Sequence, residues 1–443
     1  MNKLFFIALI SVSSLTVQAQ TITTIAGNGT EGYAGDGGLA VDALLRNPNQ
    51  IAYDQSGNLF IAEDYNHVVR KIDATGHIST VAGTGVMGFS GDGGIATNAQ
   101  MNRVAAVAVD NAGNIYLSDA DNFRIRKVDA LGNINTIAGN GDEGYSGDGG
   151  LAINAELGFV SGICLDPLGN IYIANQTYHN IRKIDGAGII TTVAGDGSGN
   201  PGYGGEGVVA ATSMVNSPAA VFMDASGNLF FSEFGGFRIR KINTSGILTT
   251  VAGTGNFGSS GDGGPAINAQ LLYPYGLVVD ADGVIYVCES AHNMIRKIDA
   301  SGIISAFAGV GGFVPGYSGN NGPALLAQFA NPSAITLDND NNIVIGDYGN
   351  HAIRKITSAS PTSVASGSND VVLRVFPNPC SDAFYLSIED NQAAQHAVLV
   401  YDLFGKLVYE SSMSNSLSVH TSNWSAGLYL VRVGSSVLRV AVD

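Results

Sequence analysis

The chain has 443 residues, of which 45% are hydrophobic and only 13% are charged, so it is long enough for two or three domains with packed cores. Its formal net charge of −16 lacks the basic footprint of a nucleic-acid binder and would be repelled by an anionic membrane surface. Glycine is in excess, at 59 residues, but it follows no Gly-X-Y period, which excludes collagen.

The N-terminal residues have the pattern of an export signal. Lys3 precedes an apolar run at residues 4–10, and residues 17–19 (VQA) resemble a cleavage site, so we expect residues 1–19 to be a signal peptide. No later stretch reaches the roughly 18 apolar residues of a transmembrane helix. Three cysteines are scattered along the chain: Cys164, Cys288 and Cys380. We interpret them as ordinary small residues, so packing has to stabilise the fold.

A unit recurs six times in the first three quarters of the chain. Its clearest marker is an arginine followed by lysine, spaced by 56 or 58 residues: Arg70, Arg126, Arg182, Arg240, Arg296 and Arg354. An aspartate that ends an apolar stretch recurs in the same rhythm: Asp54, Asp110, Asp166, Asp224, Asp280 and Asp338. Each unit reads as four short strands joined by tight turns, with no helical pattern between them. Six such meanders predict an all-β fold, a six-bladed β-propeller.

The two ends of the repeat predict how the ring closes. The last unit stops at Thr357 without a fourth strand, whereas Thr21–Ala26 (TITTIA) has the sequence of a fourth strand with no unit before it. We therefore predict that residues 21–27 complete the last blade, so that the propeller at residues 20–357 has no gap.

Three segments of the repeat resemble NHL repeats. They are residues 59–64 (LFIAED), 66–71 (NHVVRK) and 350–355 (NHAIRK), and the resemblance extends over residues 21–357. It implies a six-bladed propeller. It also implies a protein that serves as a binding platform, as most members of the family do, while a minority are lyases.

The C-terminal segment has a different composition. Residues 358–370 are Ser-rich and predict a linker, and residues 371–443 predict a small β-sandwich of short strands. This segment resembles the type A C-terminal sorting domain of the type IX secretion system, in residues 375–379 (VFPNP), 400–406 (VYDLFGK) and 426–429 (AGLY). The resemblance implies type IX machinery as a partner and a secreted or cell-surface location. A generic adhesive sandwich is the alternative.

One face of the propeller is expected to carry the binding site. In a four-stranded meander the connections after strands two and four share one face, and here the connections after strand four are long. We call this the long-loop face, and its six loops are residues 27–38, 83–94, 139–150, 195–207, 253–264 and 309–322. They contain 37 of the 59 glycines and nine acidic residues, but no Lys or Arg. Binding sites concentrate on such loops above a rigid scaffold.

Three sets of side chains recur on that face. The first is a glycine-flanked acid, interpreted as a helix cap or a stabiliser of its turn, with calcium binding as the alternative: Asp36, Asp92, Asp148 and Asp262, replaced in two loops by Glu206 and Asn320. The second is an aromatic residue that either stacks on a ligand or pins its own loop: Tyr33, Phe89, Tyr145, Tyr203 and Tyr317, with Ser259 in the fifth loop. The third is an acid after strand two that either attracts a cationic ligand or pairs with the repeated arginine: Glu63, Asp119, Glu233, Glu289 and Asp347, with Asn175 in the third unit.

Histidines and catalytic motifs add little to this pattern. His67, His179 and His351 share one repeat position, but zinc needs its ligands within about 2 Å of one ion, and these positions are too dispersed. We expect no cofactor, with calcium on the glycine-flanked aspartates as the alternative left open. No Ser-His-Asp or Cys-His arrangement, P-loop or dinucleotide motif is evident.

The sequence therefore predicts a secreted or cell-surface monomer that recognises a protein, peptide or glycan through the long-loop face. A lyase or hydrolase acting on a peptide or polysaccharide at the axial mouth is the alternative, and an enzyme is less expected than a binding protein. A third interpretation is that the protein has a purely structural role on the cell surface.

Overall fold

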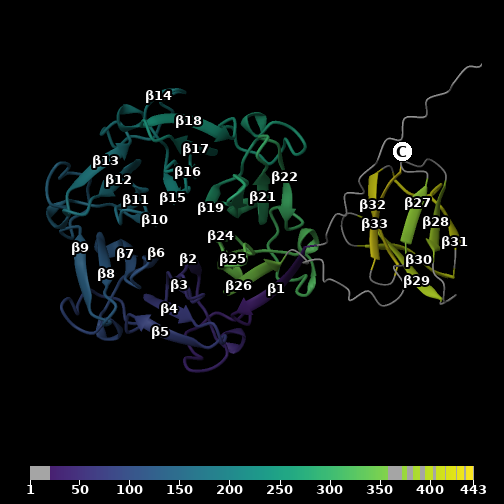
Figure 1. Ribbon diagram of the computed structural model, residues 1–443, viewed down its shortest axis with the longest axis horizontal. Coiled ribbons are helices and arrows are strands. Elements are labelled where there is room, and N and C mark those ends of the chain that lie inside the picture. Colours follow the sequence, from purple (N-terminus) through teal and green to yellow (C-terminus); the bar gives the residue numbers. More distant parts are fainter. Residues whose placement is uncertain are drawn as a thin grey trace, which may run out of the picture. The chain divides into compact units, whose positions relative to one another are not determined.

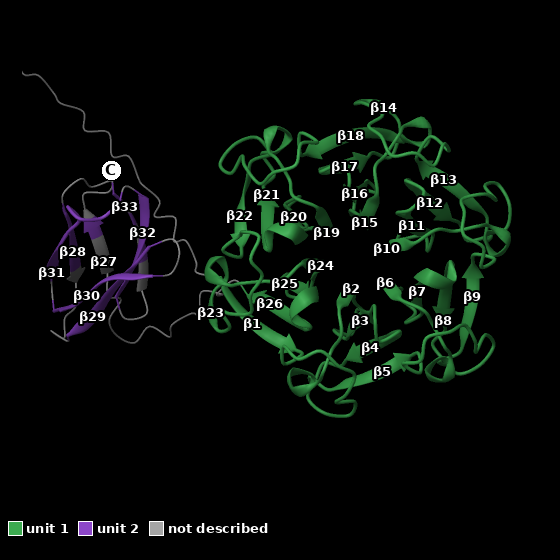
Figure 2. Cartoon of the chain, turned by 180° about the vertical axis from the view of Figure 1, so that it is seen from behind, with its two compact units in different colours: residues 1–359 green, residues 360–443 purple. Residues whose placement is uncertain are grey.

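The structure is a computed structural model that describes residues 20–357 and, in the C-terminal part, residues 372–376, 383–389, 395–402, 406–414, 416–425, 427–433 and 436–442. The chain divides into two compact units, residues 1–359 and 360–443, which Figure 2 shows in different colours. The predicted signal peptide, the predicted linker and Cys380 lie outside the described residues, as do parts of the three sorting motifs.

Residues 20–357 form six antiparallel sheets that stand around a common axis (Figure 1). The first sheet contains β2 (Pro48–Tyr53), β3 (Leu59–Glu63), β4 (Val68–Ile72) and β5 (Ile78–Ala82). The second contains β6 (Val104–Val109), β7 (Ile115–Asp119), β8 (Arg124–Val128) and β9 (Ile134–Ala138). The third contains β10 (Val160–Leu165), β11 (Ile171–Asn175), β12 (Asn180–Ile184) and β13 (Ile190–Ala194). The prediction of an all-β propeller is confirmed.

The remaining three sheets include short extra strands. The fourth contains β15 (Pro218–Met223), β16 (Leu229–Glu233), β17 (Arg238–Ile242), β18 (Ile247–Ala252) and the two-residue β14 (Val208–Val209). The fifth contains β19 (Pro274–Val279), β20 (Ile285–Glu289), β21 (Met294–Ile298) and β22 (Ile304–Ala308). The sixth contains β24 (Pro332–Leu337), β25 (Ile343–Asp347), β26 (Ala352–Thr357), β1 (Thr21–Ala26) and the two-residue β23 (Gly322–Pro323).

One-turn 3₁₀ helices interrupt the connections of the described chain. They are η1 (Ala40–Asp42), η2 (Ala96–Asn98), η3 (Ala120–Asn122), η4 (Ala152–Asn154), η5 (Ala210–Thr212), η6 (Ala266–Asn268), η7 (Ser290–His292), η8 (Ala324–Leu326) and η9 (Tyr348–Asn350). Among the described residues no helix has the length and apolar character needed to span a bilayer.

The repeated aspartate ends the innermost strand of each sheet. Asp54 Oδ1 accepts the backbone N–H groups of Ser56 and Asn58, both at 2.9 Å, and this Asx turn leads into β3. All five residues of β3 are buried because both of its faces are covered. Leu59 and Ile61 pack in a core with residues of the sixth sheet, whereas the alternating residues Phe60 and Ala62 pack with those of the second.

The sixth sheet contains strands from both ends of the propeller, residues 20–357. β1 pairs antiparallel with β26, with Thr21 opposite Thr357 and Ile22 opposite Ile356, and the two strands lie side by side in Figure 1. Ile22 is fully buried in the core that the fifth and sixth sheets share. The ring is closed by hydrogen bonds between strands from opposite ends of the repeat.

The innermost strands β2, β6, β10, β15, β19 and β24 contact one another in a closed circle around the axis. At one register position they carry small residues, which let the strands approach: Ala106, Gly162, Ala220, Gly276 and Ala334. A Cβ on Gly162 would lie 2.5 Å from the carbonyl oxygen of Ala219. The sixth residue at this position is Gln50, whose Nε2 donates to the Ile163 carbonyl oxygen at 3.0 Å and whose Oε1 accepts from the Val107 N–H at 3.3 Å. Gln50 therefore spans the axis.

The second unit is a small β-sandwich, as predicted. Its described strands form one sheet in the order β27–β28–β31 and another in the order β30–β29–β32–β33. The strands are β27 (Val372–Phe376), β28 (Ala383–Glu389), β29 (His396–Tyr401), β30 (Leu407–Met413), β31 (Ser416–His420), β32 (Gly427–Val433) and β33 (Ser436–Val442). One buried cluster draws on both sheets, with Phe384 and Leu386 from the first and Val398 and Val431 from the second.

Candidate functional site

The repeated arginines are fully buried in the third strand of each sheet, where they gather the polar groups of the long loops. Arg70 contacts Asp36 Oδ1 at 2.5 Å and Glu63 Oε1 at 3.5 Å, and it donates to the carbonyl oxygens of Ala34 and Leu44. The second and fifth sheets repeat the pattern at Arg126 and Arg296. A buried guanidinium needs such partners because water is excluded.

The acids after strand two do not face a ligand. Their side chains are fully buried and each contacts the arginine of its own sheet at 3.1 to 3.5 Å: Glu63, Asp119, Glu233, Glu289 and Asp347. The geometry supports their pairing with arginine and gives no support to a cation-attracting ring. Burial raises the pKa of Asp119 to about 6 and that of Glu63 and Asp347 to about 7, because their paired arginines only partly offset the loss of hydration.

The third sheet has Asn175 at this position yet retains Arg182. Arg182 keeps Asp148 at 2.6 Å and donates to two carbonyl oxygens, so it needs no second carboxylate. Asn175 Oδ1 accepts the Gly158 N–H at 2.8 Å, just as Asp119 Oδ1 accepts the Asn102 N–H at 2.7 Å. The shared task of this position is to receive the backbone at the end of the long loop, and a neutral side chain performs it.

The glycine-flanked acids are the second partners of the arginines. Asp36 Oδ2 also accepts the Thr80 N–H at 2.9 Å, which fastens the long loop to strand four. Four aspartates contact the arginine of their own sheet at 2.5 to 2.7 Å: Asp36, Asp92, Asp148 and Asp262. Of the two roles expected for these acids, the helix cap is wrong, because η1 follows Leu39 and has no side-chain cap.

The two loops that lack an aspartate at this position still form a hydrogen bond to strand four. Glu206 accepts the Thr250 N–H at 2.6 Å, and Asn320 Oδ1 accepts the Thr24 N–H at 2.6 Å. Where it is an aspartate, the acid is engaged with an arginine of its own sheet. Within the described residues, moreover, no group of three or more His, Cys, Asp or Glu side chains is arranged to hold a metal ion.

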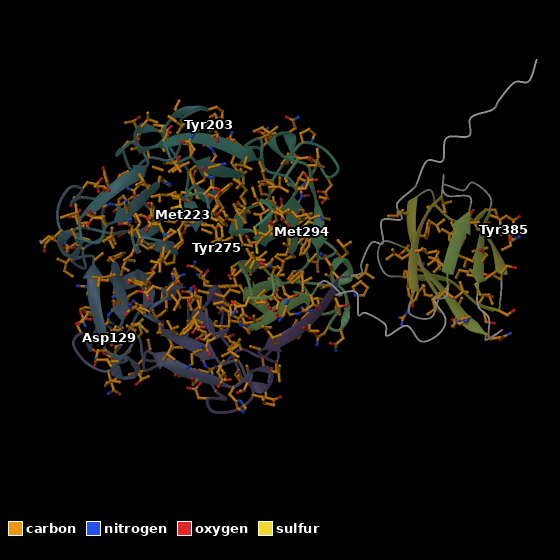
Figure 3. All side chains as sticks on the ribbon, in the orientation of Figure 1. Asp129, Tyr203, Met223, Tyr275, Met294 and Tyr385 are labelled. Atoms are coloured by element: carbon orange, nitrogen blue, oxygen red, sulfur yellow. The ribbon has the colours of Figure 1, made fainter. Side chains whose placement is uncertain are left out.

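The repeated aromatic residues pin their own loops. Tyr33, Phe89, Tyr203 and Tyr317 pack over arginines of strand three, with Phe89 3.9 Å from Arg124. The fifth member, Tyr145, packs on Tyr178 at 5.1 Å. Figure 3 shows Tyr203 at the periphery of the ring, far from Tyr275 near the axis. These side chains are placed one to a sheet and do not converge on one ligand.

The three histidines fasten neighbouring sheets to one another. His67, His179 and His351 have left-handed backbones, and their Nδ1 atoms accept backbone N–H groups of the next sheet at 3.0, 2.9 and 3.2 Å. Burial lowers their pKa values, which suits a neutral acceptor. They lie in three different sheets and do not form a zinc site.

The axial mouth of the long-loop face carries a cluster that the repeat pattern did not reveal. Asp64 is only 1% exposed, and Arg103 donates to both of its oxygens, at 3.0 and 3.1 Å. The Tyr348 hydroxyl donates to Asp64 Oδ2 at 3.2 Å. Burial and the Asp64 carboxylate raise the pKa of Tyr348, and they raise that of Tyr275 to about 12. We call Asp64, Arg103 and Tyr348 the axial cluster.

A comparison of the six copies at single positions would have found this cluster. The position of Asp64 holds a different residue in each of the other units: Ala120, Gln176, Phe234, Ser290 and Tyr348. This variation is absent from the features that the six copies share, so the shared pattern does not reveal the cluster.

A small cavity of about 30 Å³ lies on the axis at the long-loop ends of the inner strands. Its polar lining includes Asn49, Ser161, Tyr275 and Ser333, and Gln50 forms part of its wall. Asn49 is 4% exposed, and its Oδ1 has no hydrogen-bond partner among the residues that the structure describes. We call this cavity the axial pocket.

Five aromatic rings form a continuous band from a long loop to the axial pocket. The pairs Phe257–Phe237, Phe237–Tyr273, Tyr273–Phe234 and Phe234–Tyr275 have centroid distances of 5.7, 5.3, 4.6 and 5.8 Å. Phe257 lies in the loop after β18 and is 51% exposed, whereas Tyr275 lines the axial pocket. We call these five residues the aromatic stripe.

Family models match both units of the chain. Residues 374–441 match the secretion system C-terminal sorting domain, residues 329–356 match the NHL repeat, and residues 139–202 and 254–315 match the teneurin NHL domain. Segments of the propeller thus match NHL-repeat models and the C-terminal unit matches a sorting domain, so both resemblances are confirmed. The sorting domain implies interaction with the type IX machinery and marks the chain for secretion or attachment to the outer surface.

Similar proteins share the propeller in very different contexts. The chain is 29% identical over 293 residues to Protein SUPPRESSOR OF QUENCHING 1, chloroplastic, of Arabidopsis thaliana. The alignment covers 63% of this chain and 27% of that protein. It is 26% identical over 445 residues to Teneurin-3 of Danio rerio, covering 93% of this chain and 16% of that protein. The chain thus spans about a quarter or less of these relatives' length.

Solved structures show the same fold at low identity. An auxiliary nutrient binding protein from Bacteroides ovatus matches with a TM-score of 0.56 and 18% identity over 77% of both chains. One from Bacteroides thetaiotaomicron matches with a TM-score of 0.54 and 16% identity over 77% of this chain and 76% of that chain. At this identity the likeness concerns the fold.

Proposed function

We propose that the protein is a secreted or surface-attached binding protein whose ligand site is the axial mouth of the long-loop face. The observation that carries this proposal is where the six-fold pattern breaks. The repeated acids, aromatics and histidines are engaged in holding the sheets and loops together. The axial cluster, the axial pocket and the aromatic stripe are instead formed by residues that differ from sheet to sheet, and they meet around Tyr275.

The sorting domain and the fold neighbours support this proposal. A sorting domain delivers its cargo to the outside, where a rigid propeller can present a recognition surface. Two neighbours in fold are described as nutrient binding proteins, which suits a binding role for the propeller here. The ligand is to be sought among the proteins, peptides and glycans present outside the cell.

The lyase or hydrolase alternative has no supporting observation at the axial mouth. Asp64, the most buried acid there, already accepts hydrogen bonds from Arg103 and Tyr348, so it is not poised as a general base. We therefore propose recognition without chemistry.

Binding assays with paired tyrosine variants test the location of the site. Arrays of glycans and peptides are probed with the full chain, and the ligands found are titrated against Tyr348→Ala and Tyr317→Ala. Both residues belong to the sixth unit, but Tyr348 lies at the axis and Tyr317 pins a peripheral loop. We expect binding at least tenfold weaker for Tyr348→Ala and within twofold of the original for Tyr317→Ala. The reverse pattern would return the site to the periphery, and thermal melts check that both variants are folded.

A further inference from the structure

A glycine near the start of each long loop shows where the third sheet differs from the others. A Cβ added to five of these six glycines would lie within 3.2 Å of a side chain, namely Tyr317 at Gly29, Tyr33 at Gly85, Arg124 at Gly141, Arg238 at Gly255 and His292 at Gly311. The sixth is Gly197, beside the third sheet, and a Cβ there would have no atom of the described residues within 4 Å. The space beside Gly197 is therefore open.

In the second and fourth sheets the corresponding space holds an arginine of the same sheet. Arg124 packs 3.9 Å from the Phe89 ring. It also donates to the carbonyl oxygen of Asn140, at the start of the next long loop, at 2.9 Å. Arg238 packs 4.1 Å from the Tyr203 ring and donates to a loop carbonyl oxygen in the same way. The fold thus holds a guanidinium between a loop ring and a loop carbonyl at two of these places.

The third sheet has Asn180 where those two sheets have arginine. Asn180 stands at the same position of the third strand, but its side chain is too short to reach the loop. It is 2% exposed, and its Oδ1 has no hydrogen-bond partner within the described part of the chain. It adjoins the open space, because a Cβ on Gly195 would lie 2.7 Å from the Asn180 Cβ. A buried acceptor without a donor favours a ligand that donates hydrogen bonds.

A pair of tyrosine rings lies next to the open space. Tyr145 packs on Tyr178 with ring centroids 5.1 Å apart. A Cβ on Gly199, two residues after Gly197, would lie 3.2 Å from the Tyr145 ring and 3.6 Å from the Tyr178 ring. Tyr145 is the counterpart of the loop rings that hold an arginine in the second and fourth sheets. It is therefore a loop ring that has no guanidinium of the third sheet packed on it.

Acidic side chains surround this pair of rings. Burial and the charges of Glu143 and Glu156 raise the pKa of the Tyr178 hydroxyl, so both carboxylates lie near its ring. Asp196 directly precedes Gly197 and is exposed. Among the described residues none of these three acids forms an ion pair with a basic side chain. The three carboxylates favour a cationic ligand.

The bases of the neighbourhood do not cancel this charge. Arg182 is buried and already paired with an aspartate at 2.6 Å. Arg124 belongs to the second sheet, and counting it still leaves three acids against one arginine. In the first sheet, by contrast, Glu31 contacts Arg46 at 2.6 Å. Glu143 is the counterpart of Glu31, but the third sheet has a glycine in place of Arg46.

From the open space, the unpaired acceptor and the surplus of acids we infer that the third sheet binds an arginine side chain of a partner polypeptide. The guanidinium lies beside Gly197, packs on the Tyr145 and Tyr178 rings, and donates to Asn180 Oδ1 and the adjacent carboxylates. Arginine fits better than lysine, because a planar guanidinium can stack on a ring while it donates hydrogen bonds in its own plane. The site shares no residue with the axial cluster, the axial pocket or the aromatic stripe, so it does not rest on the proposed function.

The experiment uses the full chain and four probes. Three are capped pentapeptides, Gly-Ser-X-Ser-Gly, in which X is arginine, citrulline or lysine, and the fourth is free arginine. Citrulline has the shape of arginine without its charge. Affinities are measured by calorimetry for the original chain, for Asn180→Arg, and for a double variant with Glu143→Gln and Glu156→Gln. The control is Asp42→Asn, which removes one exposed acid from η1.

We expect the arginine peptide to bind about tenfold more tightly than the citrulline peptide, and more tightly than the lysine peptide or free arginine. Asn180→Arg should abolish this binding without lowering the melting temperature, because its own guanidinium occupies the space as Arg124 does in the second sheet. The double variant should bind about tenfold more weakly, and Asp42→Asn within about twofold of the original chain.

Unchanged binding in folded Asn180→Arg would contradict the inference. If that variant does not fold, the double variant decides, since its two substitutions lie outside the buried core. A lysine peptide or free arginine that binds as tightly as the arginine peptide would overturn the assignment to an arginine of a polypeptide. If the arginine peptide does not bind, the inference is wrong, and the proposed function, which depends on Tyr348, is unaffected.

Discussion

At the scale of single residues, the buried arginine of the first, second and fifth sheets is bound from two sides. An exposed aspartate of the long loop and a buried acid after strand two both contact it, as Asp92 and Asp119 contact Arg126. One cation then faces two acids, and the buried acid is the one that loses hydration. The third sheet shows that this acid can be neutral, because Asn175 stands there and Arg182 retains Asp148.

The raised pKa values predict how stability depends on pH. Burial raises the pKa of Asp119 from 3.8 to about 6, so the folded chain binds more protons than the unfolded chain between these values. The contribution of this group is therefore greatest below pH 3.8 and is lost as the pH rises through about 6. We expect Asp119→Asn to make the free energy of unfolding less dependent on pH between about 4 and 7, by about 1–3 kcal/mol. Urea unfolding at three pH values measures this.

The matched control is Asp92→Asn, which changes the exposed partner of the same arginine. It should keep the pH slope of the original chain, because the buried acid is untouched. An unaltered slope in Asp119→Asn, or a loss of slope in the control, would contradict the assignment of the titration to the buried acid.

Sequence reasoning foresaw one of the two partners of each arginine. Glu63 lies in the strand beside Arg70, so the meander alone predicts their contact. Asp36 lies 34 positions before Arg70 in a long loop, and its contact depends on how that loop folds back over its own sheet. Spacing carries no information on such a path, and the helix-cap interpretation failed for this reason.

At the scale of elements, the long loops are fixed to their own sheets by side-chain contacts. The first loop is held by Asp36 on strand four, by the Ala34 carbonyl on the buried Arg70 and by the Tyr33 ring packed over strand three. The alternation and the Asp-containing turns predict the four strands well. The one-turn helices and the two-residue strands β14 and β23 were not foreseen, because they form where a loop touches a neighbouring strand.

The ring over strand three should limit loop motion. Phe89 packs 3.9 Å from the Arg124 guanidinium, and such contacts stabilise by about 0.5–1 kcal/mol at partly exposed sites. We expect Phe89→Ala to speed amide hydrogen exchange in residues 83–94 several-fold, as mass spectrometry of peptides would show. Residues 139–150 in the same variant provide the internal control. Equal exchange in the two loops would mean that Phe89 does not hold its loop.

The closing strand β1 should contribute strongly to stability. Ile22 is fully buried opposite Ile356, so Ile22→Ala removes apolar contacts from a closed core and should lower the free energy of unfolding by about 3 kcal/mol. Thr23→Ala on the partly exposed side of the same strand should change it by less than about 1 kcal/mol. Denaturant titration compares the two. Similar small effects would indicate that the ring is stable without β1.

At the scale of the whole molecule, fold and export were predictable and the site was not. The repeats and the sorting motifs are local patterns that many residues share, so the propeller and its class follow from them. The axial pocket gathers residues from several inner strands, among them Asn49, Ser161 and Tyr275. Those residues are neighbours only once the ring exists, and a search for shared features passes over positions that differ.

The sorting domain should act independently of the propeller. The two units are separate in their contacts, so we expect a chain ending at residue 357 to keep the melting temperature of its propeller. The same truncation should leave the protein on the inner side of the outer membrane, because the sorting domain at residues 374–441 is missing. Fractionation of a type IX-competent cell and a thermal melt of the recovered protein measure the two effects. Normal release of the truncated chain would show that another signal directs export.

The pairing of β1 with β26 also determines when the molecule can be finished. Thr23 lies next to Lys355 across 332 positions of the chain, so the first strand to appear has no permanent partner until the last sheet is present. Until then the growing arc has an unpaired strand edge at its end, which is prone to join with other chains. If the chain enters a compartment N-terminus first, β1 has to stay unpaired until β26 has arrived. A chaperone that covers the unpaired strand edge of the incomplete ring would therefore raise the yield of closed rings.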